Sequence, residues 1–204
     1  MIGKIHWRRV AEAAPLDEVR EAILTGYLDG KPFSPYAPLL EMPRLERVLD
    51  FGCGLGRNFP YLRSAAHQVV GFDLEQMLQR CRLEVDHDGV ELTADWPWVR
   101  RQHFDCVFAC LVLQHIAPDD LRTYLSDFAT MAPWLYVLSR GRSDFGGGVF
   151  QEIASTGTFT GTVCNVVEHD PTAHGLKHCA AVPLWEALAD DRHYEVLLAS
   201  TVSR

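Results

Sequence analysis

Short runs of apolar residues alternate with helical patterns along most of the chain. The apolar runs predict strands at 47–51, 68–73, 90–94, 104–110 and 134–139. Amphipathic patterns between them predict helices at about 57–65, 75–84 and 118–132. This alternation is typical of an α/β protein, in which helices connect parallel strands and cover the sheet.

The two ends of the chain follow other patterns. An amphipathic helix is predicted over 9–28 and a proline-rich connector over 31–44, so we expect residues 1–44 to form an N-terminal helix and lid and residues 45–204 to form the main domain. The aromatic residues Tyr27, Phe33 and Tyr36 are able to close over an apolar pocket as a substrate lid, or merely to cap the sheet.

The C-terminal third contains a candidate substrate-side insertion around 140–181. Within it, 156–167 alternates small, threonine and β-branched residues, which predicts a hairpin or extra strands. A helix near 182–190 and a strand near 194–202 are predicted to close the chain.

Composition narrows the function classes. With 204 residues the chain is long enough for one domain, or for one domain with a lid. The net charge of -8 disfavours nucleic acid as a partner, because nucleic-acid binding needs a basic face. No apolar run approaches the roughly 20 residues of a membrane span, and the first residues lack the apolar stretch of a secretory signal. Six cysteines without a Cys-x-x-Cys pair favour free thiols, no metal site and a cytoplasmic location.

A glycine-rich loop follows the first predicted strand of the main domain. Asp50 ends the strand, and glycines then occupy every second position, at Gly52, Gly54 and Gly56. A strand, such a loop and a helix together form the nucleotide pocket of open α/β sheets. The Gly-x-Gly-x-x-Gly fingerprint of dinucleotide-binding proteins is missing, because Arg57 and Phe59 stand where its third glycine belongs. An NAD-dependent oxidoreductase is therefore disfavoured.

Acids also follow the second and third strands. Asp73 follows Asp50 by 23 residues, as expected for one helical crossover, and a carboxylate there can accept hydrogen bonds from the ribose hydroxyls of an adenosine. Asp95 follows the third strand and precedes Trp96. Asp is also a favoured helix cap, so capping is the alternative interpretation of both acids.

These motifs together resemble those of class I S-adenosylmethionine (SAM) dependent methyltransferases. The acid-x-Gly-x-Gly-x-Gly loop resembles the family's first motif, and Phe104-Asp105-Cys106-Val107 with the segment up to His115 resembles its fourth. The resemblance covers 46–116 and implies a three-layer Rossmann-like methyltransferase fold, with a mostly parallel sheet and an antiparallel C-terminal strand. The residues that the resemblance places around SAM are Asp50, Gly52, Cys53, Gly54, Asp73, Leu74, Asp95, Trp96, Cys110 and Leu111.

In this family the loop holds the methionine half of SAM, the third acid accepts from the adenine amino group, and the backbone after the fourth strand faces the acceptor. The resemblance implies methyl transfer to a small-molecule acceptor by a monomer or homodimer. Its catalytic residue is left open, with His115, His169 and His174 as candidates; packing is the other interpretation of His115. A SAM- or adenosine-binding module without turnover and a methyltransferase acting on protein or RNA remain alternatives.

Overall fold

The computed structural model describes residues 12, 43–84, 86–170 and 175–202. The predicted lid residues Tyr27, Phe33 and Tyr36 lie outside these ranges. Of residues 1–42 the structure describes only Glu12, which is helical. The prediction of an N-terminal lid is therefore untested.

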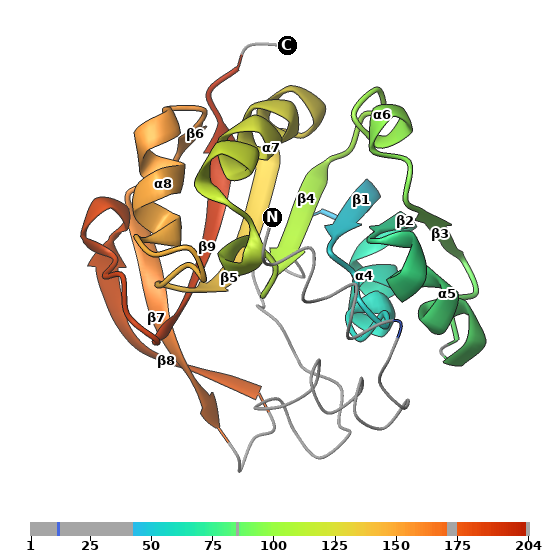
Figure 1. Ribbon diagram of the computed structural model, residues 1–204, viewed down its shortest axis with the longest axis horizontal. Coiled ribbons are helices and arrows are strands. Elements are labelled where there is room, and N and C mark those ends of the chain that lie inside the picture. The colour runs from blue at the N-terminus through green and yellow to red at the C-terminus, as the bar shows by residue number, and fades with distance from the viewer. Residues whose placement is uncertain (1–11, 13–42, 85, 171–174, 203–204) are drawn as a thin grey trace.

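The described residues form one sheet of nine strands, ordered β3-β2-β1-β4-β5-β9-β7-β8 with β6 paired to β9 (Figure 1). Five parallel strands make up its first part: β1 (Leu45–Phe51), β2 (Ala66–Phe72), β3 (Val90–Thr93), β4 (Cys106–Cys110) and β5 (Trp134–Arg140). All five predicted strands are confirmed with boundaries within two residues. Because these strands are parallel, their carboxyl ends meet at one edge, where the glycine loop and the acids lie.

The second part of the sheet is antiparallel. It contains β6 (Phe159–Thr160), β7 (Val163–Asp170), β8 (Gly175–Pro183) and β9 (His193–Ser200). β9 lies between β5 and β7 and runs antiparallel to both, which confirms the predicted antiparallel C-terminal strand. The extra strands predicted around 156–167 are also confirmed, since β6 and the start of β7 fall there.

The prediction of a helix near 182–190 is wrong. β8 continues to Pro183, and only a single 3₁₀ turn, η2 (Leu184–Glu186), follows it. The apolar residues of this segment do not share one buried face, because Leu184 and Ala187 are buried while Trp185 and Leu188 are 68% and 55% exposed. Leu184, Ala187 and Leu188 have the i, i+3, i+4 spacing that suggests a helix, but Leu188 is exposed, so this spacing does not pack a helix against the sheet.

The helices cover both faces of the sheet. They are α4 (Phe59–Ala65), α5 (Glu75–Glu84), α6 (Trp96–Val99), α7 (Pro118–Met131) and α8 (Val149–Thr156), with a 3₁₀ turn η1 (Leu113–His115) after β4. α4 and α5 pack on one face through Phe59, Leu62 and Leu78, and α7 and α8 pack on the other through Phe128 and Phe150. The three predicted helices are confirmed, and α8 is an addition that the periodicity did not predict.

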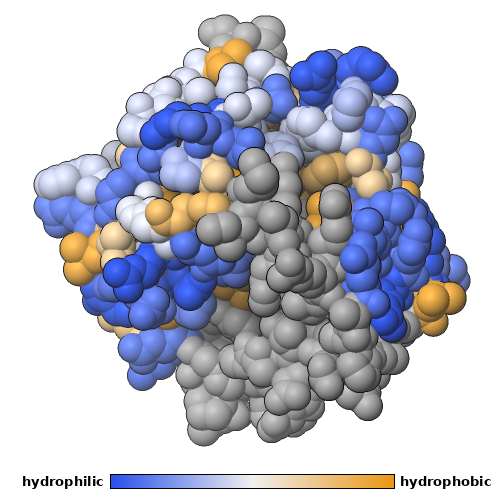
Figure 2. All heavy atoms as spheres, viewed as in Figure 1, coloured by the Kyte–Doolittle hydropathy of each residue, from blue (hydrophilic) through white to orange (hydrophobic). Residues whose placement is uncertain are grey.

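The described surface is mostly hydrophilic in the view of Figure 2, and hydrophobic residues occur on it as separate small patches. None of the helices in the described ranges is long and apolar enough to cross a bilayer.

Candidate functional site

The glycine loop leaves β1 in a conformation that side chains would obstruct. Gly52, Gly54 and Gly56 all have positive φ, at 75°, 57° and 74°, which favours glycine because a Cβ would be strained there. A Cβ on Gly52 would also overlap the side chain of Val112, which follows β4. The loop therefore turns tightly and lies directly against the exit of β4.

Asp50 is a buried acid beside this loop. Its side chain is 1% exposed, and both of its carboxylate oxygens lack a hydrogen-bond donor among the described residues. Burial raises the pKa of Asp50 from 3.8 to about 8; the nearby Arg57 opposes this shift and the charge of Asp73 adds to it. A buried carboxylate without a donor is costly, so this position favours a ligand that brings a cation or hydrogen-bond donors.

Asp73 connects the end of β2 to the glycine loop. Its Oδ2 accepts a hydrogen bond of 2.7 Å from the backbone N–H of Gly54, and its Oδ1 accepts one of 2.6 Å from that of Leu74. Burial raises the pKa of Asp73 to about 6, although these two hydrogen bonds lower it. The carboxylate keeps further lone pairs, because two carboxylate oxygens offer about four acceptor sites.

Asp95 is the N-cap of α6, as the capping interpretation predicted. Its Oδ1 accepts from the backbone N–H of Trp98 at 3.0 Å, and its side chain is exposed at the edge of the sheet. The ring of Trp96 packs against Phe72 and Phe51, with centroid distances of 5.1 and 5.6 Å. The cap occupies one carboxylate oxygen, so it does not exclude a ligand at the other.

The exit of β4 contains the one non-glycine residue with positive φ in the described ranges, Leu111, at 57°. Its N–H donates to the carbonyl of Leu138 on β5 at 2.6 Å, which holds the turn in place. Such backbone strain in a leucine is uncommon and is found preferentially at functional sites. Cys110 precedes it and accepts from Nη2 of Arg57 at 3.6 Å. Burial raises the pKa of this thiol to about 11, so it is neutral at pH 7.

His115 lies at the end of η1 and pairs with an acid that sequence reasoning missed. Its Nδ1 is 2.6 Å from Oδ2 of Asp144 in the loop after β5, and Arg140 donates to the other oxygen of this carboxylate at 2.5 Å. No local pattern indicated Asp144, because its role depends on two loops that meet only in the folded sheet. Of the other candidate bases, His174 is not described, and His169 lies in β7 with a side chain that is not described.

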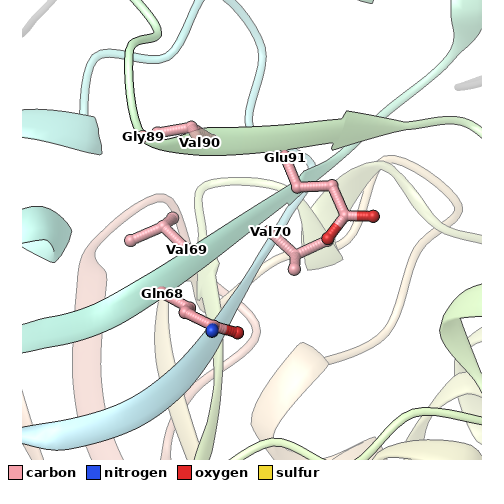
Figure 3. A pocket seen from close by; sticks show the side chains of 6 residues that line it. All are labelled: Gln68, Val69, Val70, Gly89, Val90 and Glu91. Atoms are coloured by element: carbon pink, nitrogen blue, oxygen red, sulfur yellow. The ribbon is translucent and has the colours of Figure 1, made fainter.

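A shallow groove lies elsewhere, between β2 and β3 (Figure 3). It is lined by Gln68, Val69, Val70, Gly89, Val90 and Glu91. These residues lie in the middle of β2 and at the start of β3, before the strand ends that Asp73 and Asp95 follow. Glu91, the one ionisable residue of the groove, already pairs with Arg47 at 3.3 Å. The groove therefore offers no unpaired ionisable side chain among its lining residues, and it is separate from the candidate site.

The described residues contain no group of three or more His, Cys, Asp or Glu side chains that could hold a metal ion. The candidate site instead consists of acids and backbone turns at the ends of β1 to β4. Together with the strand order, this edge defines a Rossmann-like α/β protein whose nucleotide loop is not of the dinucleotide type.

Comparisons with known proteins agree with this class. Residues 49–132, from the end of β1 to the residue after α7, match the family model described as "Methyltransferase domain". No protein of curated function matches the chain in sequence.

Several solved structures share the fold. The N-methyltransferase NodS from Bradyrhizobium japonicum WM9, in complex with S-adenosyl-L-homocysteine (SAH), is 13% identical with a TM-score of 0.58, over 96% of this chain and 92% of that one. Magnesium protoporphyrin IX methyltransferase (ChlM) from Synechocystis PCC 6803, with bound SAM, is 16% identical with a TM-score of 0.56, over 98% and 91%. A DhpI–SAH complex is 13% identical with a TM-score of 0.55, over 97% and 95%.

Residues 49–132 thus match a methyltransferase domain, and the fold is the Rossmann-like fold of methyltransferases solved with SAM or SAH. The fold that the sequence resemblance implied is confirmed, and the family model matches the part of the chain in which the resemblance was found.

Proposed function

We propose that this protein transfers the methyl group of SAM to a small-molecule acceptor at the carboxyl edge of β1 to β5. The observation that carries the proposal is the buried carboxylate of Asp50, which lacks a donor among the described residues. SAM carries a positively charged ammonium and a sulfonium. A cation beside Asp50 would stabilise its ionised form, which burial otherwise disfavours.

The remaining acids provide for the adenosine half of SAM. Asp73 lies next to Asp50 and retains acceptor capacity for ribose hydroxyls after binding Gly54 and Leu74. Asp95 is exposed farther along the same edge, where its free oxygen would accept from the adenine amino group. Cys53, Trp96, Cys110 and Leu111 complete the cofactor wall that the family resemblance assigns.

In-line transfer needs positioning and exclusion of water more than it needs reactive groups. The nucleophile attacks the methyl carbon, and the carbon–sulfur electron pair returns to sulfur to give SAH. A small-molecule acceptor is supported by the named activity of a fold neighbour, a magnesium protoporphyrin IX methyltransferase. We further propose that residues 1–44, with Tyr27, Phe33 and Tyr36, close over the acceptor.

Isothermal titration calorimetry tests the cofactor site directly. We expect SAM and SAH to bind the wild-type protein and NADH not to bind. Asp73→Asn should weaken SAH at least tenfold, because an asparagine cannot accept from two amides and two hydroxyls.

Glu91→Gln is the matched control, since it alters an acid in the groove of Figure 3 without touching the carboxyl edge. Its affinity for SAH should equal that of the wild type. Binding of NADH without SAH, or equal loss of SAH binding in both variants, would contradict the proposal.

A further inference from the structure

Asp50 lies in the middle of the sheet, and its side chain has no hydrogen-bond donor among the described residues. β1 runs between β2 and β4, where Asp50 is in register with Gly71 and Phe108. The side chain is 1% exposed, which leaves it almost no contact with bulk solvent. Burying an ionised carboxylate without donors is so costly that such a group takes up a proton instead. We therefore expect a neutral carboxyl group at this position in the cofactor-free protein at neutral pH.

The charges around Asp50 favour the same protonated form. Among the described residues, four ionisable side chains interact with it electrostatically: Cys53 and Arg57 in the glycine loop, Asp73 after β2 and Cys110 at the end of β4. Arg57 is the one cation of these four, but its Nη2 donates to Sγ of Cys110 at 3.6 Å and not to Asp50. Burial, which is the largest effect, and the charge of Asp73 together outweigh Arg57 and raise the pKa of Asp50 to about 8. Both thiols are neutral at pH 7, because burial raises the pKa of each of them as well.

Asp73 differs from Asp50 in the way its charge is held. It accepts from the backbone N–H groups of Gly54 and Leu74, at 2.7 and 2.6 Å. These bonds stabilise the carboxylate, so the pKa of Asp73 rises only to about 6 in spite of burial. At pH 7 Asp73 is therefore mostly ionised without a ligand, whereas Asp50 needs a cationic ligand to ionise.

We infer that SAM binding drives a proton off Asp50, so that the ammonium of the methionine half takes the place of that proton. This inference rests on the proposed function. The O–H bond of the Asp50 carboxyl breaks, the proton passes to water, and the carboxylate pairs with the ammonium, which keeps its own protons. One positive charge leaves as another enters, so the buried position never holds an uncompensated charge.

The affinity for the cofactor must then depend on pH. Binding lowers the pKa of Asp50, so protons compete with the ligand, and the Kd rises as pH falls below about 8. Between pH 5.5 and 7 we expect a change of about tenfold per pH unit, because about one proton is exchanged for each ligand. The ammonium remains charged over this range, since the ordinary pKa of an α-amino group is about 7.7–8.0. Cofactor binding should therefore weaken steeply in mildly acidic solution.

Two ligands separate Asp50 from the other acids of the site. SAH carries the ammonium, whereas 5′-methylthioadenosine has the same adenosine and a thioether sulfur but lacks the amino acid. Asp73 and Asp95 are proposed to contact only the adenosine half, so their contribution is common to both ligands. The ratio of the two dissociation constants should therefore change about tenfold per pH unit through Asp50 alone.

Isothermal titration calorimetry counts the protons directly. At pH 7, titrations in PIPES and in Tris, which differ in their enthalpy of ionisation, give the number of protons released per ligand. We expect roughly 0.9 for SAH, which is the protonated fraction of a group with a pKa of about 8, and at most about 0.2 for 5′-methylthioadenosine.

Asp50→Asn keeps the shape of the side chain and cannot ionise. It should bind SAH more weakly, release no proton from this position and show a ratio of dissociation constants that does not change with pH. It should still bind 5′-methylthioadenosine, which shows that the site is folded. Glu91→Gln is the matched control, because it alters an acid outside the carboxyl edge, and it should behave as the wild type does.

SAH binding without proton release, or a ratio of dissociation constants that is the same at pH 5.5 and 7, would overturn the inference and leave the cofactor site standing. Proton release by Asp50→Asn equal to that of the wild type would also overturn it. Failure of the wild type to bind SAH would refute the proposed function first, so the two failures are distinguishable. Both ligands are compared on the wild type, so the test does not depend on the folding of a variant.

Discussion

Replacing Asp50 with asparagine should make the cofactor-free protein more stable at neutral pH and should abolish its response to SAM. In the folded protein the Asp50 carboxyl is 1% exposed and accepts no hydrogen bond from the described residues. Asparagine has nearly the same shape and never ionises. The substitution therefore removes the cost of burying or protonating this carboxyl, and it also removes the charge that SAM would need.

The size and sign of the effect follow from proton linkage. Asp50 has a pKa of about 8 in the folded protein, against an ordinary value of 3.8, so between these values the folded state binds more protons than the unfolded state and stability falls as pH rises. At pH 7 the raised pKa of Asp50 lowers the free energy of unfolding by about 4 kcal/mol. pH 7 lies about three units above 3.8, and each unit corresponds to about 1.4 kcal/mol. An unpaired buried amide costs about 1–3 kcal/mol in the variant. We expect Asp50→Asn to be about 1–3 kcal/mol more stable at pH 7 and no more stable at pH 4.

Urea unfolding of both proteins from pH 4 to 8 measures this difference. The pKa of Asp73, raised to about 6, adds a slope of the same sign in both proteins, so the comparison reports the contribution of Asp50 together with its interaction with Asp73. Added SAM should raise the unfolding midpoint of the wild type only, because ligand binding to the folded state stabilises it. A variant less stable than the wild type at pH 7.5, or a difference that does not change with pH, would refute the reasoning.

Two further predictions concern the backbone of the site. Gly52→Ala should lose SAH binding and, by urea unfolding, be about 1–3 kcal/mol less stable than Gly89→Ala. Both glycines have a φ of 75°, but a Cβ at Gly52 overlaps Val112, whereas a Cβ at Gly89 meets nothing within 4 Å. Equal stability of the two variants would contradict the overlap. At Leu111, with a φ of 57°, the glycine variant should be about 1 kcal/mol more stable than the alanine variant, and the reverse order would show that the turn is unstrained.

The parallel half of the fold could be predicted because its signals are local. Each of β1 to β5 is an apolar run bounded by a turn, and a buried strand needs little more than that. The start of α7 was equally local, with Pro118 in its first turn and Asp119 and Asp120 following it. These features act within a few residues, so no tertiary information was needed.

Two segments of the C-terminal region could not be predicted in the same way. The apolar residues at 182–190 suggested a helix, but Pro183 ends β8 and Leu184 and Ala187 are buried against other elements. Conversely α8 is only eight residues long and begins after Gly148, so its short stripe of Val149, Phe150 and Ile153 is too brief to stand out. In both segments tertiary packing decides the structure rather than local periodicity.

In the candidate site, too, the residues set by local sequence could be predicted and those brought together by tertiary contacts could not. The glycines and acids follow the strands in the sequence, so Asp50, Asp73 and Asp95 could be placed at one edge from topology alone. The partner of His115 could not be, because Asp144 is 29 residues away and reaches it only through the loop after β5. That pairing is a tertiary contact, so the sequence did not predict it.

Burial alone does not mark the functional acid of this fold. Glu195 on β9 is as buried as Asp50, but it accepts from Tyr136 at 2.5 Å and pairs with His178 at 2.7 Å, so its charge is compensated inside the protein. Asp50 has no donor of this kind among the described residues, and it lies two residues before the positive-φ Gly52, which Val112 of the β4 exit approaches closely. The uncompensated buried acid and the unfavourable backbone conformations thus occur at the same edge of the sheet. Because a cationic ligand would relieve the largest of these costs, the cost of burying Asp50 and the proposed affinity for SAM would have the same physical origin.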